Sequence, residues 1–182
     1  VREHVGGHHG ERFANWIVEK MGAGTVWTDE RRTRPRCPFT AHGETFHSAH
    51  DRSSAHFAAW HSPKRPVEKW GDHFKLNEAR VWMRLHFWSM REVGIVDQCP
   101  AFADYYSRLI GHFVSVYERT APPFTRESLR WSADPKNIEH YLSNGRTMPD
   151  VHVPYAEAIK CLPEHEREYH GSSSNKKFWP YD

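Results

Sequence analysis

The chain has few of the residues that mark several common protein classes. Its three cysteines, Cys37, Cys99 and Cys161, lie far apart and form no CxxC pair. An odd count without a paired framework argues against a disulfide-stapled secreted fold. We expect each cysteine to be a buried thiol, because that is the commonest environment of a free cysteine. No apolar run is long enough for a membrane-spanning helix, so we expect no transmembrane segment.

The chain also has no large excess of positive or negative charge. Lysine and arginine total 25 against 23 aspartates and glutamates, which leaves a formal net charge of +2. Proteins that bind nucleic acids are usually strongly basic because they neutralise phosphates, so we expect no nucleic-acid partner. The motifs GxSxG, HExxH, GxxxxGK[ST] and GxGxxG are missing as well. We therefore predict that the chain is not an enzyme and holds no cofactor.

Leucine and isoleucine are scarce, with six and five among 182 residues, and eight tryptophans, seven tyrosines and ten phenylalanines supply the bulk instead. Tryptophan and tyrosine combine a large apolar area with a polar end, and they are enriched where one protein packs on another. Two interpretations follow and do not exclude each other. The aromatic residues form a small core, or the chain completes its burial against partner subunits.

The strongest helical pattern runs from Leu76 to Gly94, which contains no internal glycine or proline. A second helix is expected to start at Pro100, since proline suits the first helical turn. The predicted buried row of the first helix is Val81, Leu85 and Trp88, widened by Trp82, Met90 and Val93, with Arg80, Arg84 and Arg91 outside it. The row of the second is Phe102, Tyr106, Leu109, Phe113 and Val116, spaced as in a helix-packing seam. Two such helices with a short connection predict an antiparallel αα-hairpin.

These patterns predict a mainly α fold: a central antiparallel αα-hairpin with short flanking helices and long irregular arms that become ordered on partners. The expected segments are a flexible arm (1–10), a short amphipathic helix (11–24), an irregular connector (25–72), the hairpin (73–119), short helices (120–170) and a C-terminal tail (171–182). The hairpin is the best-supported part of this prediction.

Histidine is abundant, with fifteen in the chain. The best set of metal ligands is Cys37, His42, His47 and His50, which could supply the four ligands of a tetrahedral zinc site. The spacing matches no common zinc-finger pattern, and clusters are expected by chance in such a histidine-rich chain. We expect no metal, and a structural zinc stays the alternative. For His86 and His112 in the two central helices, we expect packing or partner contact rather than a metal or haem pair.

The predicted contacts with partners come from three parts of the chain. Bulky aromatic residues and arginine are the usual hot spots of protein interfaces. The basic run that contains Arg31 and Arg32 could meet an acidic partner, anionic lipid headgroups or RNA, or stay solvated. The alternating glutamates Glu164, Glu166 and Glu168 predict a solvated face. The predicted contact residues are Trp82 and Trp88 in the centre, Phe178, Trp179 and Tyr181 in the tail, and Arg31 and Arg32.

The chain begins at Val1, for which we expect a removed organellar transit peptide, an engineered or incomplete start being the alternative. Together these features predict a non-catalytic accessory subunit of a large mitochondrial inner-membrane energy-conversion complex, either a respiratory-chain complex or an ATP synthase. The subunit would lie peripheral to the membrane and act in structure or assembly through contacts with other subunits. The alternatives are a mitochondrial ribosomal protein, or a small zinc-stabilised module or metalloenzyme that uses Cys37, His42, His47 and His50.

Overall fold

The computed structural model describes residues 3–33, 60–61, 63 and 65–168. The chain divides into two compact units, Val1–Asp72 and His73–Asp182. The described residues contain helices and no strand, so the predicted mainly α class is confirmed. Among these residues, no helix has both the length and the apolar character needed to cross a membrane. The predicted C-terminal tail, 171–182, lies outside them.

The first unit contains a pair of packed helices, α1 (Glu3–Lys20) and α2 (Val26–Thr33). Trp16 of α1 and Trp27 of α2 are both buried. Arg12 joins the two helices, because its Nε lies 2.9 Å from Glu30 Oε1 and its guanidinium lies 5.0 Å from the centre of the Trp27 ring. The helices therefore share a small aromatic interface.

Two boundaries in this unit differ from the sequence prediction. The segment predicted as a flexible arm is helical from Glu3 onward. Once a helix is nucleated, each added residue gains a backbone hydrogen bond, so the glycines near the start do not stop it. The predicted irregular connector begins with α2, whose buried Trp27 gives this short helix a surface to pack on. Further along the connector, residues Val67–Lys69 form one turn of 3₁₀ helix, η1.

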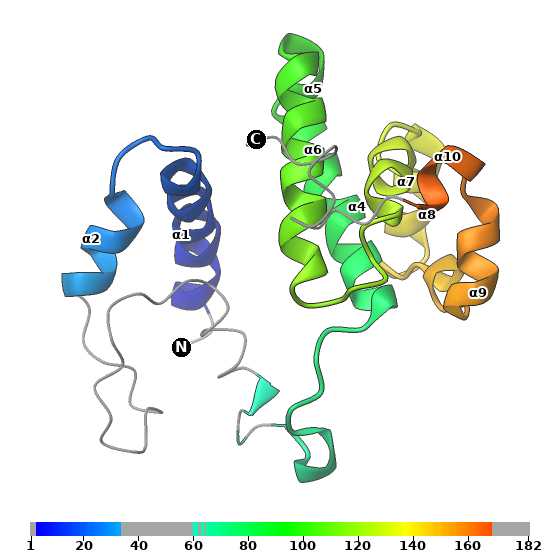
Figure 1. Cartoon of the computed structure of the whole chain (residues 1–182), viewed down its shortest axis with the longest axis horizontal. Coiled ribbons are helices and arrows are strands. Elements are labelled where there is room, and N and C mark those ends of the chain that lie inside the picture. Colours follow the sequence, from blue (N-terminus) through cyan, green and yellow to red (C-terminus); the bar gives the residue numbers. More distant parts are fainter. Residues whose placement is uncertain (1–2, 34–59, 62, 64, 169–182) are drawn as a thin grey trace. The chain divides into compact units, whose positions relative to one another are not determined.

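The centre of the second unit consists of α4 (Leu76–Glu92), the short α5 (Ile95–Gln98) and α6 (Pro100–Ser115). The chain runs along α4, turns through α5 and returns along α6 (Figure 1). Both ends follow local rules of the sequence. Gly94 adopts a left-handed φ of +76°, which ends α4, and Pro100 occupies the first turn of α6. The first predicted central helix is thus found within two residues of its expected ends, and the second begins at the expected Pro100 and ends at Ser115, before the predicted end of the hairpin at residue 119.

The rest of the second unit is a series of short helices. Asp134 caps α8 by accepting a hydrogen bond of 2.9 Å from the Lys136 backbone N–H, and Asn144 and Gly145 end it. The short elements are α7 (Phe124–Trp131), α8 (Pro135–Ser143), η2 (Pro149–Val151), α9 (Tyr155–Ala158), η3 (Ile159–Cys161) and α10 (Glu164–Arg167).

The buried face of α4 differs from the predicted row. Val81, Leu85 and Trp88 are only half-buried, and Trp82 and Val93 are exposed. The reason is that α4 packs most extensively along α7 rather than along α6, which turns a neighbouring face inward. The side chains that α4 buries are Ala79, Arg80, Met83, Arg84, Phe87 and Met90.

The prediction for α6 is correct in part. Tyr106 and Leu109 are buried, whereas Phe102 and Phe113 are half-buried and Val116 is exposed. The helix instead buries a broader strip that includes Ile110 and Val114, since it lies against α5 and α7 as well as α4. A helix with several neighbours buries a wider face than a two-helix seam requires.

Candidate functional site

The densest group of ionised side chains in the described residues lies between α4, α7 and η2. Arg80 and Arg84 are one turn apart on α4, and they face Glu127 of α7 and Asp150 of η2. Arg84 is only 1% exposed. We call these four residues the charge cluster. Its two negative charges balance those of the two buried arginines, and the Asp150 side chain is itself 56% exposed.

Arg84 makes the shortest contacts in the charge cluster. Its Nη1 lies 3.0 Å from Asp150 Oδ1 and its Nη2 lies 2.6 Å from Asp150 Oδ2, so the guanidinium and the carboxylate form a two-pronged pair. Nη2 also donates to Glu127 Oε1. Arg80 lies further out, with its Nη2 3.4 Å from Glu127 Oε1 and its Nη1 3.4 Å from the Asp150 carbonyl oxygen.

One aromatic ring lies against each of the two guanidinium groups. The Cζ of Arg80 lies 4.6 Å from the centre of the Phe124 ring, and the Cζ of Arg84 lies 5.0 Å from the Trp131 ring. A cation over a ring face is attracted by the negative charge of that face, and the attraction grows when water is excluded. The rings therefore help to compensate the arginines for lost hydration.

Electrostatics favours the ionised forms of Arg84 and Asp150. Burial raises the pKa of Asp150, but the hydrogen bond and charge of Arg84, with a further contribution from Arg80, outweigh it and hold that pKa below its ordinary value. Burial lowers the pKa of Arg84, but its contacts with Asp150 and Glu127 outweigh this and raise it. Each partner thus stabilises the charged form of the other.

Two further arginines fasten neighbouring segments. Arg130 of α7 pairs with Glu166 of α10 through both carboxylate oxygens, with 2.9 Å from Nη2 to Oε2. Arg91 of α4 donates to Ser132 Oγ at 3.0 Å and to the Leu129 carbonyl oxygen at 3.1 Å, near the end of α7. The prediction of a solvated face is therefore wrong for Glu166, which is buried because Arg130 neutralises it.

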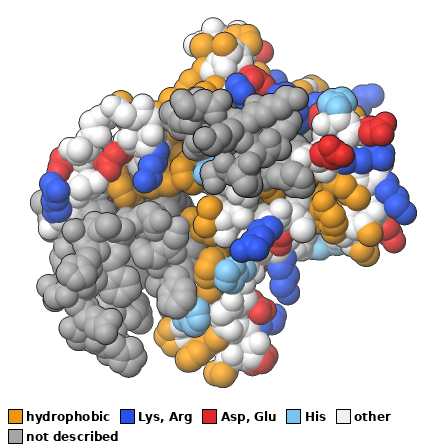
Figure 2. Space-filling model, in the orientation of Figure 1, with side chains coloured by type: hydrophobic (Ala, Val, Ile, Leu, Met, Phe, Trp, Pro, Cys, Tyr) orange, Lys and Arg blue, Asp and Glu red, His pale blue; other side chains and the backbone are white. Residues whose placement is uncertain are grey.

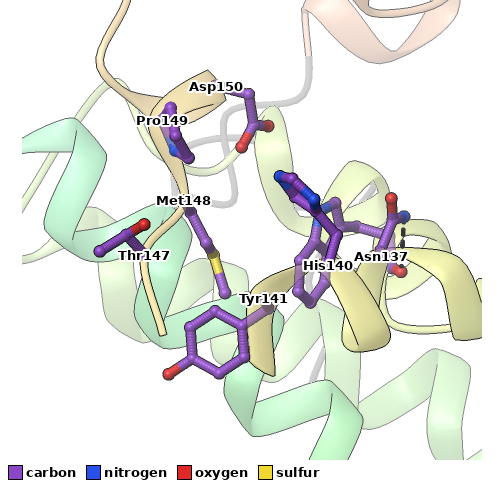
Figure 3. A pocket seen from close by; sticks show the side chains of 8 residues that line it. Asn137, His140, Tyr141, Thr147, Met148, Pro149 and Asp150 are labelled. Carbon is purple, nitrogen blue, oxygen red and sulfur yellow. Dashed lines mark hydrogen bonds between the residues drawn. The ribbon is translucent and has the colours of Figure 1, made fainter. Parts of the chain in front are cut away.

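A half-open cleft of about 390 Å³ lies beside the charge cluster (Figure 3). Trp131 and Tyr141 meet edge to face, with 6.5 Å between their ring centres, and Met148 points toward Tyr141. Asn137 donates to the Trp131 carbonyl oxygen at 3.1 Å. The residues that line the cleft are Trp131, Asn137, His140, Tyr141, Thr147, Met148, Pro149 and Asp150.

The contacts of the charge cluster join three segments of the chain. Both oxygens of Asp150 already bind Arg84, and Glu127 Oε1 binds both arginines. What the charge cluster does is hold α4, α7 and η2 together.

A stack of aromatic rings lies on the other side of α4, toward α6. His86 stacks on Trp82 with 4.8 Å between ring centres and on Tyr106 with 5.6 Å, and Tyr106 stacks on Phe102. His86 Nε2 and Tyr106 Oη are joined by a hydrogen bond of 3.1 Å. Burial lowers the pKa of His86 to about 4 and raises the pKa of Tyr106, so both are neutral at physiological pH. The expectation that His86 serves packing agrees with these contacts.

The predicted metal site lies outside the described residues, since Cys37, His42, His47 and His50 fall within 34–59. In the part of the chain that the structure describes, no three histidine, cysteine or acidic side chains are grouped as metal ligands would be. The prediction of buried thiols is wrong for Cys99 and Cys161, which are both exposed. Cys99 lies at the junction of α5 and α6, and Cys161 ends η3.

The predicted partner contacts lie in different surroundings. Trp82 is 42% exposed, while Trp88 is half-buried against Tyr141 and donates from its Nε1 to Glu92 at 3.1 Å. Arg32 on α2 is exposed and lies 3.2 Å from Asp29. Arg31 lies on the same helix, and Phe178, Trp179 and Tyr181 lie outside the described residues.

The sequence reasoning missed the charge cluster. Positions 80, 83, 84, 87 and 90 already form one continuous helical face in the sequence, but two of them are arginines, and we placed arginine on the solvated side. The signal that could have revealed them is a pair of arginines at i and i+4 inside an otherwise apolar stripe that contains Met83 and Phe87.

Three comparisons with known proteins place the chain in no family. No family model, no curated protein and no solved structure matches it, so the function is argued from the residues themselves.

Proposed function

We propose that the chain is a non-catalytic structural subunit that binds other protein subunits within a larger assembly. The observation that carries the proposal is the exposure of two indole rings, with Trp70 46% exposed and Trp82 42% exposed. Tryptophan is highly buried on average in folded proteins, and it is enriched in the cores of protein interfaces. Exposed tryptophans on both units are therefore typical of surfaces that another protein covers.

The use of charge inside the chain supports a structural role. The charged side chains that the described residues bury are Arg80, Arg84 and Glu166. Each pairs with an opposite charge on another segment of the same chain. Removing one member of a buried ion pair strongly destabilises a fold, because the other charge is left without a partner. The polar interactions of the interior thus hold the short helices in place as a scaffold.

The finer part of the proposal concerns the host. We propose a mitochondrial inner-membrane energy-conversion complex, either a respiratory-chain complex or an ATP synthase, in which the chain lies peripheral to the membrane. This part is supported by the type of sequence: an aromatic-rich composition, a near-neutral charge and the irregular connector that the sequence predicts. A segment that becomes ordered on binding can wrap over a large surface of its neighbours.

Native purification tests both parts. The full chain, carrying an affinity tag, is expressed in its source cells, and the proteins that co-migrate with it on a native gel are identified by mass spectrometry. We expect stoichiometric co-migration with subunits of a respiratory-chain complex or an ATP synthase. Co-migration with ribosomal proteins would contradict the host. A chain that migrates alone and unfolds cooperatively as a stable monomer would contradict the structural role as well.

A further inference from the structure

Three rings between α4 and α6 lead from the surface into the fold. Trp82 is 42% exposed, whereas Tyr106 is only 7% exposed. His86 lies between them, with its ring centre 4.8 Å from that of Trp82 and 5.6 Å from that of Tyr106. Its plane makes angles of 19° and 28° with theirs. We call these three residues the ring stack.

The inner end of the ring stack lies in apolar surroundings. Phe102 stacks on Tyr106 with 5.6 Å between ring centres and 13° between planes. Near the start of α6, Figure 2 shows hydrophobic side chains at the surface of the tip where the chain turns through α5. Val93, which precedes this turn, is 64% exposed. The Tyr106 ring is thus shielded from water, while the outer end of the stack remains accessible.

A base lies at hydrogen-bond distance from the Tyr106 hydroxyl. His86 Nε2 is 3.1 Å from Tyr106 Oη, within the distance of about 2.6 to 3.2 Å over which a proton passes directly between two groups. Burial lowers the pKa of His86 to about 4 and raises the pKa of Tyr106, so both are neutral at physiological pH. A neutral imidazole with its proton on Nδ1 accepts through Nε2, and the phenol then donates. The hydroxyl proton therefore has a defined acceptor.

This arrangement suits the loss of one electron. Indole and phenol rings are readily oxidised, and an electron moves quickly between rings that are in contact. A phenol that has lost an electron is a far stronger acid than an imidazolium, so its proton moves to His86 even though burial lowers the pKa of that ring. The resulting imidazolium lies over the face of Trp82, which attracts a cation.

We propose that the ring stack is a one-electron oxidation site for small oxidants of the peroxyl-radical class. The peroxyl radical takes one electron from Trp82 and one proton from the solvent, and becomes a hydroperoxide. Trp82 recovers an electron from Tyr106, the Oη–H bond of Tyr106 breaks, and its proton goes to His86 Nε2. The products are the hydroperoxide, a neutral Tyr106 radical and a His86 imidazolium.

The ring stack thus moves a radical from the surface to a buried position, where few molecules can react with it. This activity goes beyond the proposed structural role and does not depend on it. An electron can tunnel through a thin layer of protein, so a partner that covers Trp82 does not isolate the ring stack.

Flash oxidation of the free full-length chain tests the site. Light-excited ruthenium(II) tris(bipyridine), quenched by a cobalt(III) complex, gives ruthenium(III), which removes one electron from the protein. Transient absorption follows the tyrosyl radical, and electron paramagnetic resonance of a frozen sample with ring-deuterated tyrosine identifies it. We expect a rapid phase of tyrosyl formation that slows in D₂O, because a proton moves with the electron. A radical found on tryptophan alone would overturn the inference.

Substitutions of one ring by another locate the radical. Tyr106→Phe should abolish the rapid phase, and Trp82→Phe should slow it because the outer ring of the stack is changed. His86→Phe keeps a ring in the stack but removes the base, and should slow the phase by at least about tenfold, since a positioned base contributes about 10²–10⁴-fold. The matched control is Tyr141→Phe, a tyrosine that contacts two tryptophans outside the ring stack, and it should keep the phase. A rapid phase that survives Tyr106→Phe, or an unchanged rate in His86→Phe, would contradict the inference.

Nuclear magnetic resonance of the histidine ring nitrogens tests the proton path in the unaltered chain. We expect His86 to carry its proton on Nδ1 at neutral pH and to accept a hydrogen bond at Nε2. A proton on Nε2 would remove the acceptor and overturn the inference. All these measurements use the free chain, so their failure leaves the proposed function standing. Conversely, a chain that enters no assembly can still show the oxidation site.

Discussion

Arg84 holds Asp150 through both carboxylate oxygens, at 3.0 Å from Nη1 to Oδ1 and 2.6 Å from Nη2 to Oδ2. The two residues are 66 positions apart in the chain. The same guanidinium donates to Glu127, which lies 43 positions away. One buried side chain of α4 thus fixes both α7 and η2. The stability of the second unit should therefore depend on it.

The substitution Arg84→Ala should destabilise the protein by about 3 to 5 kcal/mol, because it leaves Glu127 partly buried without its main partner. Urea unfolding at neutral pH measures the change. The control is Arg126→Ala, which removes an exposed pair with Asp104 at 3.0 Å and should cost less than about 1 kcal/mol. If both variants lose equally little free energy of unfolding, the charge cluster does not stabilise the fold.

The half-buried His86 should make the fold sensitive to acid. Its pKa in the folded chain, about 4, lies below the ordinary value of 6.5. Between these values the unfolded chain binds a proton that the folded chain does not, so stability falls as the pH falls through this window. We expect the titration of this residue to lower the free energy of unfolding by about 2 kcal/mol between pH 7 and pH 5.

The substitution His86→Phe isolates that component, because phenylalanine keeps a ring in the stack and does not titrate. The free energy of unfolding is measured by urea titration at pH 7 and at pH 5 for both proteins. Carboxylates contribute equally to the pH dependence of both proteins. Between pH 7 and pH 5 the free energy of unfolding of the variant should therefore fall by about 2 kcal/mol less than that of the unaltered chain. Parallel pH profiles would show that His86 is not neutral in the fold.

The pair between Arg130 and Glu166 should govern the docking of α10. Replacing Glu166 by alanine removes both charge-assisted hydrogen bonds, and we expect local opening of α10 to become easier by about 1 to 3 kcal/mol. Hydrogen exchange of the 164–167 amides, followed by mass spectrometry, reports this opening. Glu164→Ala on the same helix, where the side chain is exposed, should leave the exchange rate unchanged.

The turn after α4 should tolerate only glycine. Gly94 has a φ of +76°, and a Cβ added there would lie 2.7 Å from Gln98 Nε2. The substitution Gly94→Ala should cost about 1 to 2 kcal/mol, mainly through the left-handed backbone that alanine avoids. Thermal unfolding followed by circular dichroism measures it.

Gly10 provides a control of opposite sign. It lies inside α1, and a Cβ added there would meet nothing within 4 Å. The substitution Gly10→Ala should stabilise the helix by about 0.5 to 1 kcal/mol. If the thermal unfolding midpoint moves in the same direction for Gly94→Ala and Gly10→Ala, backbone conformation does not explain the effects.

The ends of α4 and the start of α6 followed from the sequence because local interactions decide them. Gly94 and Pro100 act on the backbone within a few residues of themselves. For this reason the predicted bounds of α4 and the predicted start of α6 agree closely with the structure. The start of α1 was missed because glycine lowers helix propensity without forbidding a helix that is already nucleated.

The residues of the site were decided by tertiary structure alone. Arg80 and Arg84 are on the buried face of α4 because Glu127 and Asp150, from distant parts of the chain, supply the opposite charges. Without those partners burial of an arginine is unfavourable, so the sequence of α4 by itself predicts the solvated side. Glu166 follows the same rule through Arg130. Local sequence determined the bounds of α4 and the start of α6, whereas packing against α7 and charge pairing with distant residues determined which face of α4 is buried.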